Sequence, residues 1–252
     1  MIQEALDFSS EPMITPKKIY KTAVTASCDV CIITFSRIIY SHVLQSYDCT
    51  EIAHISACNG KIPIYRMNLE GKCIAFYLSA IGSAMAGTCI EEAAYLIGAK
   101  HFIMFGSAGC LNQTAAGKIV IPTYAYRDEG FSYHYCAPSD YIEIRNAARV
   151  AKMLEQRHIP YEMGRTWTTD AIYRETAVKV RKRKAEGCVT VEMECAGAQA
   201  VCDYLGIQLY DFLTCGDILD LPEWNVGGLA AANHKLGNFS IALAIASEIT
   251  GK

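Results

Sequence analysis

The chain has 252 residues, of which 52% are hydrophobic, and its 23 basic and 26 acidic side chains leave a formal charge of −3. A chain of this length can bury about three-quarters of its unfolded surface without disulfides or metals, which excludes a disordered or low-complexity protein. The basic residues are too few and too scattered for the broad basic surface of a nucleic-acid binder. Glycine and polar residues interrupt the apolar stretches, so none is long enough to span a membrane.

Apolar runs alternate with helical patterns along the chain. Continuous apolar runs are typical of strands buried on both faces, and apolar residues three or four apart indicate helices. In chain order they predict strands at 30–35 and 73–80, a helix at 83–97, strands at 101–105 and 119–126, a helix at 145–157, a strand at 188–193, a helix at 196–205, a strand at 207–213 and a helix at 229–249. The basic run 179–184 is interpreted as a solvated helix face.

This alternation predicts an α/β fold with a mixed, largely parallel central sheet and helices on both sides. No linker divides the chain, so we expect one domain over residues 1–252. Acidic residues interrupt the first dozen positions, which argues against a secretory signal and favours a cytoplasmic protein. The twelve cysteines then pack as reduced, small hydrophobic residues. The single CxxC motif, Cys28 to Cys31, lacks further ligands at matching spacing, so no metal site is expected.

Three strand ends carry candidate chemistry, because ligands of such sheets bind beyond the carboxyl ends of the strands. Gly106 and Ser107 enter a predicted small-residue turn that could hold phosphate or could simply be a tight strand exit. Glu192 and Glu194 alternate, so they share one side and could bind vicinal sugar hydroxyls; Glu194 could equally begin a helix. Asp217 is a general acid toward a heteroaromatic leaving group, or a helix N-cap.

Five segments in register resemble the nucleoside phosphorylase-I family, which includes hexameric purine nucleoside phosphorylases, uridine phosphorylases and related nucleosidases. The segment VEMECAG at 191–197 is similar to the family's V-E-M-E-x-A/S motif. SAIGS at 79–83, FGSAG at 105–109, IVIP at 119–122 and YRDEG at 126–130 resemble the others. The agreement runs from about residue 28 to the C-terminus, which leaves residues 1–25 as a divergent N-terminal extension.

The resemblance implies the family's three-layer α/β/α fold and phosphorolysis of a nucleoside to the free base and (deoxy)ribose 1-phosphate. Inorganic phosphate is then the co-substrate, no metal or organic cofactor is needed, and the protein is a homo-oligomer, either a dimer or a hexamer. The implied catalytic residues are Glu194 and Asp217. The implied substrate-binding residues are Ile81, Tyr133, Tyr135, Tyr173, Arg174, Glu192, Met193 and Glu194, and the implied phosphate-binding residues are Arg37, Lys61, Gly106 and Ser107.

Two departures from the family pattern bear on the nucleophile. The first phosphate loop, P-G-D-P-x-R in the family, reads Ile33-Thr-Phe-Ser-Arg37 and lacks the Gly-Asp pair. The family's second phosphate arginine is Met104 here, so charge-assisted bonds to phosphate are lost. Asp217 favours purine over pyrimidine bases. The alternatives are a uridine phosphorylase, a nucleosidase that uses water, and a non-catalytic nucleoside-binding protein.

Overall fold

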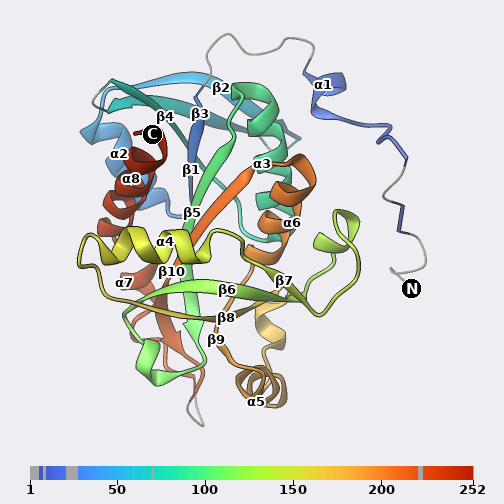
Figure 1. Ribbon diagram of the computed structural model, residues 1–252, viewed down its shortest axis with the longest axis vertical. Helices are drawn as coiled ribbons and strands as arrows, with labels where there is room; N and C mark the ends of the chain where they lie inside the picture. Colours follow the sequence, from blue (N-terminus) through green and yellow to red (C-terminus); the bar gives the residue numbers. More distant parts are fainter. Residues whose placement is uncertain are drawn as a thin grey trace.

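The computed structural model describes residues 6–7, 10–20, 28–58, 60–69, 71–220 and 224–251 (Figure 1). Much of the expected extension 1–25 therefore lies outside the described residues. The strands are β1 (Val30–Thr34), β2 (Cys49–Ala57), β3 (Gly60–Leu69), β4 (Lys72–Leu78), β5 (His101–Cys110), β6 (Ile119–Asp128), β7 (Tyr141–Glu143), β8 (Tyr161–Thr169), β9 (Cys188–Glu192) and β10 (Gln208–Ile218). The helices are α1 (Pro16–Ile19), α2 (Arg37–Ser46), α3 (Ser83–Ile97), α4 (Ala147–Glu155), α5 (Ala177–Ala185), α6 (Cys195–Leu205), α7 (Leu229–Asn233) and α8 (Gly237–Thr250).

The strands form one mixed sheet that is parallel at its centre, where β4, β1, β5 and β10 are neighbours. β3 and β2 continue it in antiparallel fashion at one edge. Beyond β5 the sheet curls into a closed circuit, because β10 pairs with β6, β6 with β8, β8 with β9, and β9 with β5. β5 is thus the strand shared by the flat part and the closed part.

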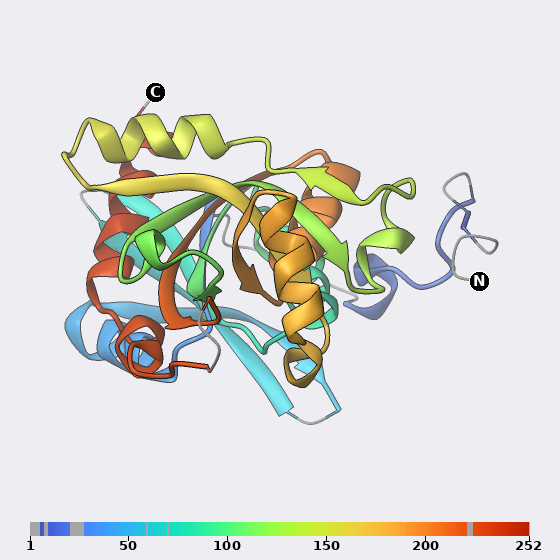
Figure 2. The same ribbon diagram turned by 90° about the horizontal axis from the view of Figure 1, so that it is seen from below.

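Helices cover both sides of the sheet, which confirms the predicted α/β architecture (Figures 1 and 2). On one side α3 and α6 pack together, and their buried residues join one apolar cluster with β1, β4 and β5. On the other side α2, α4 and α8 contribute to a second cluster. Alternate side chains of the central strands point into the two clusters, which explains why the sequence of these strands is apolar without interruption.

The helix α3 matches the predicted range 83–97 and ends at Gly98, whose φ of 69° is the left-handed conformation that glycine adopts readily. The predicted helix 229–249 is wrong as one element, because residues 234–236 separate α7 from α8. The sequence analysis also missed α2, β2, β3 and β8. These strands are half-exposed and carry charged residues, so they lack the continuous apolar run that identifies a central strand.

The cysteines differ in one respect from the expectation. Ten of them are free, and most of these are buried, as predicted for small hydrophobic residues. Cys28 and Cys73, however, are joined as a disulfide that links the segment before β1 to β4.

Candidate active site

Four strand ends meet at one edge of the sheet. Thr34 of β1 is in register with Phe105 of β5, and Ser107 of β5 is in register with Thr214 of β10. The amide of Ser79, just after β4, donates to the carbonyl of Thr34 at 2.9 Å. These parallel strands all leave the sheet in the same direction, so the residues that follow them lie around one site.

β9 reaches the same edge from the opposite direction. It pairs antiparallel with β5 through Gly109 and Val191, so the residues after Val191 run back along β5 toward Ser107. Two contacts join this segment to the turn before α3: the amide of Gly82 donates to Glu194 Oε1 at 2.7 Å, and Ser83 Oγ donates to the carbonyl of Met193 at 3.1 Å. The register therefore brings the two acids and Ser107 into one region.

Glu194 is the N-cap residue of α6, but its side chain makes no capping bond to that helix. Instead the side chain reaches the N-terminus of α3 through Gly82, and only 9% of the residue is exposed. Burial, reinforced by the nearby carboxylate of Glu192, raises the pKa of Glu194 to about 8. At neutral pH the group can hold a proton, so it can donate to one hydroxyl of a ligand and accept from another.

The oxygens of Glu192 are bonded within the protein, and its predicted role in binding a sugar stays a prediction. Its Oε2 accepts the amides of Glu194 and Cys195, both at 2.7 Å, and its Oε1 accepts the hydroxyl of Thr168. Burial raises the pKa of Glu192, and these three donors oppose that rise. With its oxygens engaged by the protein, Glu192 holds the turn that presents Met193 and Glu194.

The predicted small-residue turn at 106–109 is wrong as a turn, because β5 continues as a strand to Cys110. Gly106 and Ser107 are half-buried inside this strand. Met104 is 2% exposed and packs in the apolar cluster beneath α3 and α6, so the position where the family carries an arginine brings no charge.

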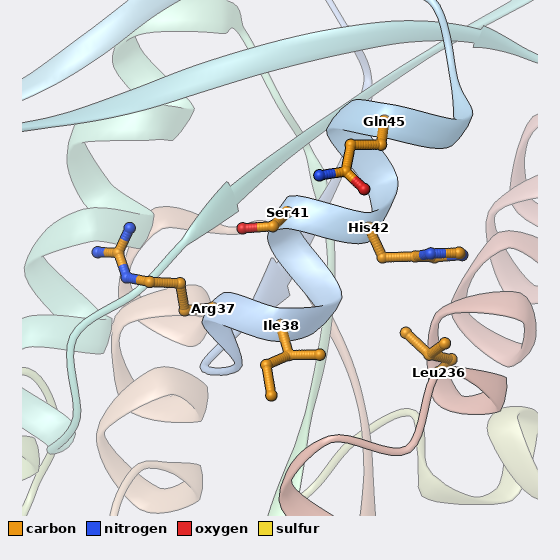
Figure 3. Close-up of a pocket in the computed structure, with 6 residues that line it drawn as sticks. All are labelled: Arg37, Ile38, Ser41, His42, Gln45 and Leu236. Carbon is orange, nitrogen blue, oxygen red and sulfur yellow. The ribbon is translucent and has the colours of Figure 1, made fainter.

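The first loop presents Ser36 and Arg37 at the N-terminus of α2. Ser36 Oγ caps this helix by accepting the amide of Ile39 at 3.2 Å. The exposed Arg37 lines a hollow of about 230 Å³ that also includes Lys61 of β3, so the two predicted phosphate cations face one cavity. Arg37 also borders a shallow pocket of about 390 Å³ on the outer face of α2 (Figure 3). There its side chain points away from His42 and Leu236 (Figure 3).

The sequence analysis missed two side chains that reach this region from α7 and the turn after it. The hydroxyl of Ser107 donates to Asn233 Oδ1, and Ser36 Oγ lies 2.8 Å from His234 Nδ1. The partners are 126 residues apart in the first contact and 198 residues apart in the second, so no local sequence pattern could have paired them.

A third group lies at the end of β10. Asp217 Oδ2 accepts the indole N–H of Trp224 at 2.6 Å. Burial and the charge of Asp217 raise the pKa of Glu175 to about 7, while Lys179 opposes that rise. Two carboxyl groups and an indole therefore lie together, which is an arrangement able to supply a proton to a departing base.

The predicted aromatic wall has definite partners. The guanidinium carbon of Arg127 lies over the ring of Tyr133, 4.0 Å from the centroid of that ring. The hydroxyl of Tyr135 donates to Glu91 of α3 at 2.9 Å. Tyr173 and Ile81 are 97% and 66% exposed. Arg174, next to Tyr173, is exposed as well. The binding roles of these residues stay predictions.

Among the curated proteins that are similar in sequence over part of the chain, two illustrate the match. The DeoD-type purine nucleoside phosphorylase of an Exiguobacterium species is 24% identical over 159 residues, which are 60% of this chain and 65% of that protein. An uncharacterized protein of Acanthamoeba polyphaga mimivirus, R802, is 30% identical over 80 residues, 31% of this chain and 32% of that protein. The matched part of the chain thus spans just under two-thirds of the length of the Exiguobacterium protein and about a third of the length of R802.

Solved structures share the fold over most of the chain. Purine nucleoside phosphorylase from Toxoplasma gondii, in complex with immucillin-H, superimposes with a TM-score of 0.73 at 19% identity over 89% of this chain and 92% of that one. Futalosine hydrolase of Helicobacter pylori gives 0.70 at 16% identity over 89% and 98%. AMP nucleosidase from Bacteroides thetaiotaomicron gives 0.67 at 18% identity over 94% and 96%.

Two further findings bear on the class of protein. In the part of the chain that the structure describes, every helix is too short or too polar to cross a membrane. The family model of the phosphorylase superfamily matches residues 29–234, which include all four strand ends at the site. The chain therefore belongs to the phosphorylase superfamily.

Proposed function

We propose that this enzyme cleaves the N-glycosidic bond of a nucleoside with inorganic phosphate, giving the free base and (deoxy)ribose 1-phosphate, and that it prefers purines. The observation that carries the proposal is the environment of Glu194. Its carboxyl group is buried at the shared edge of the sheet, where the amide of Gly82 donates to its side chain at 2.7 Å. Such burial is costly unless a ligand supplies partners, and sugar hydroxyls have the right chemistry.

The reaction assigns one task to each group. The C1′–N bond loosens first and its electrons leave with the base, while a phosphate oxygen forms the new bond to C1′. Glu194 holds the sugar hydroxyls, and Ser107 with Arg37 holds the phosphate. Asp217 supplies the hydrogen bond or proton that the departing base needs. Catalysis comes from positioning and from stabilising charge that develops in the transition state.

A nucleosidase that uses water is the second candidate, and two observations favour it. Met104 brings no charge to the anion site, and the hydroxyl of Ser107 is already bonded to Asn233. A site with less positive charge binds a phosphate dianion less well, while water needs no such charge. Futalosine hydrolase and AMP nucleosidase share this fold.

One assay separates the two candidates. Inosine, adenosine, guanosine, uridine and thymidine are each incubated with the protein, with and without phosphate, and the base and sugar products are identified by chromatography. Phosphorolysis predicts phosphate-dependent release of the base together with a sugar 1-phosphate. Equal release without phosphate, with free sugar as the product, identifies a nucleosidase. Release from uridine alone overturns the assignment of Asp217 to a purine.

The variant Glu194→Gln tests the residue that carries the proposal. It keeps the shape of the side chain but replaces one carboxyl oxygen, which can accept from a hydroxyl or carry the proton, with an amide N–H₂ group that only donates. We expect kcat/KM for the nucleoside to fall roughly 10- to 100-fold, the effect of leaving a buried hydrogen-bonding group without its partner. Glu248→Gln is the matched control, because Glu248 pairs with Arg157 on the surface at 2.9 Å. An active Glu194→Gln enzyme with unchanged kcat/KM removes the basis of the proposal.

The same proposal extends to the state of the protein. We propose a cytoplasmic homo-oligomer, either a dimer or a hexamer, that needs inorganic phosphate and no organic cofactor or metal. The many free, buried thiols are compatible with a reducing compartment, whereas the Cys28–Cys73 disulfide favours an oxidising one.

A further inference from the structure

Asn233, the last residue of α7, and His234, which follows it, each contact one serine of the proposed anion site. His234 Nδ1 lies 2.8 Å from Ser36 Oγ, and Asn233 accepts the hydroxyl of Ser107. Ser36 follows β1 and Ser107 lies within β5. These two strands are neighbours, since Thr34 of β1 is in register with Phe105 of β5. The chain after Gly228 thus contacts both sides of the site where the nucleophile of the proposed reaction would lie.

The charge at this site is unusual for a phosphate pocket. Met104 is apolar and buried, so β5 brings no cation. Arg37 and the N-terminus of α2 bring positive charge from the first loop. The exposed imidazole of His234 is the further ionisable group in contact with Ser36.

The hydrogen bonds of Ser36 leave His234 able to donate. Ser36 Oγ accepts the amide of Ile39, so its own proton can go to His234 Nδ1. The neutral ring then carries its proton on Nε2, and the protonated ring donates from both nitrogens. In both states the Nε2–H group points away from Ser36, and no described residue is shown to accept its proton, so it can bond an oxyanion that enters on that side of the ring.

Resting on the proposed phosphorolysis, we propose that His234 is a phosphate-binding residue that supplies a hydrogen-bond donor in place of the arginine missing at position 104. Asn233 fixes the hydroxyl of Ser107 beside it. When phosphate enters, rotation of the Asn233 amide places its N–H₂ group toward Ser107 Oγ, and the serine proton turns to the phosphate. In this role His234 is a hydrogen-bond donor that orients the nucleophile, and no proton is transferred.

The test is steady-state kinetics with phosphate and nucleoside varied independently, for the wild type, His234→Ala and His234→Gln. We expect His234→Ala to raise the KM for phosphate roughly 10- to 100-fold and to leave the KM for the nucleoside unchanged. His234→Gln keeps a neutral donor and is expected to fall between the wild type and His234→Ala. The control His54→Ala removes a histidine of β2 that pairs with Glu51 at 3.8 Å, and it should leave both constants unchanged.

The outcomes distinguish this inference from the proposed function. If the wild type needs phosphate and both His234 variants keep its KM for phosphate, the inference is overturned and phosphorolysis stands. If the wild type releases base equally without phosphate, both are overturned. Calorimetric titration with inorganic phosphate gives a readout that does not depend on turnover: weaker binding to folded His234→Gln supports the inference, and equal binding refutes it.

Discussion

Asp211 offers a prediction about stability that the structure makes quantitative. It lies on β10 in register with Met104, is 1% exposed, and among the described residues neither carboxyl oxygen has a hydrogen-bond partner of normal geometry. Burial raises the pKa of Asp211 to about 8, and the nearby Glu192 adds to the rise. The folded protein therefore keeps this acid protonated at neutral pH, whereas the unfolded chain ionises it at about pH 3.9.

The consequence is a loss of stability as the pH rises. Between about pH 4 and pH 8 the folded state holds one proton more than the unfolded state at this site, so the free energy of unfolding falls by about 1.4 kcal/mol per pH unit. The contribution of Asp211 is complete below the unfolded pKa and is lost as the pH rises to the folded pKa. Asp211→Asn keeps the shape and removes the titration. Its stability relative to the wild type should rise by about 3 kcal/mol between about pH 5 and pH 7.

The measurement is urea unfolding followed by circular dichroism at several pH values in this range, for the wild type, Asp211→Asn and the exposed control Asp48→Asn. The difference between the slopes is informative even if the asparagine packs less well, because a packing cost is the same at each pH. Parallel pH dependences of the wild type and Asp211→Asn would show that Asp211 is ionised in the folded state and refute the reasoning.

Two further predictions concern the turn and the base site. Gly197→Ala places a Cβ 2.6 Å from that of Ser83, so we expect the free energy of unfolding, measured by urea titration, to fall by about 1–3 kcal/mol. We also expect kcat/KM to fall as the Gly82–Glu194 contact shifts. A variant as stable as the wild type would show that α3 and α6 can separate freely. Glu175→Gln removes an acid with a pKa of about 7, so the decline of the rate of base release above that pH should flatten; an unchanged pH–rate profile would exclude Glu175 from the proton supply.

Local chemistry explains what the sequence predicts well. The range of α3 is correct because Gly98 ends it in a left-handed conformation, and the central strands are recognisable because they are buried on both faces. Half-exposed strands such as β3 escape prediction because they alternate irregularly. The contacts of Asn233 and His234 escape it for another reason: they depend on how α7 returns to the sheet, which no local periodicity records.

The acid pair shows where the rule of alternation along a strand stops applying. Alternation places residues 192 and 194 on one side only while the strand continues, but β9 ends at Glu192. There the carboxylate of Glu192 accepts the two amides that follow Met193 and bends the chain away from the strand. Glu194 consequently meets the N-terminus of α3, where the amide of Gly82 donates to its side chain. Of two buried neighbouring acids, the one with fewer donors holds the proton more readily, so Glu194 is the acid that a sugar hydroxyl can still engage.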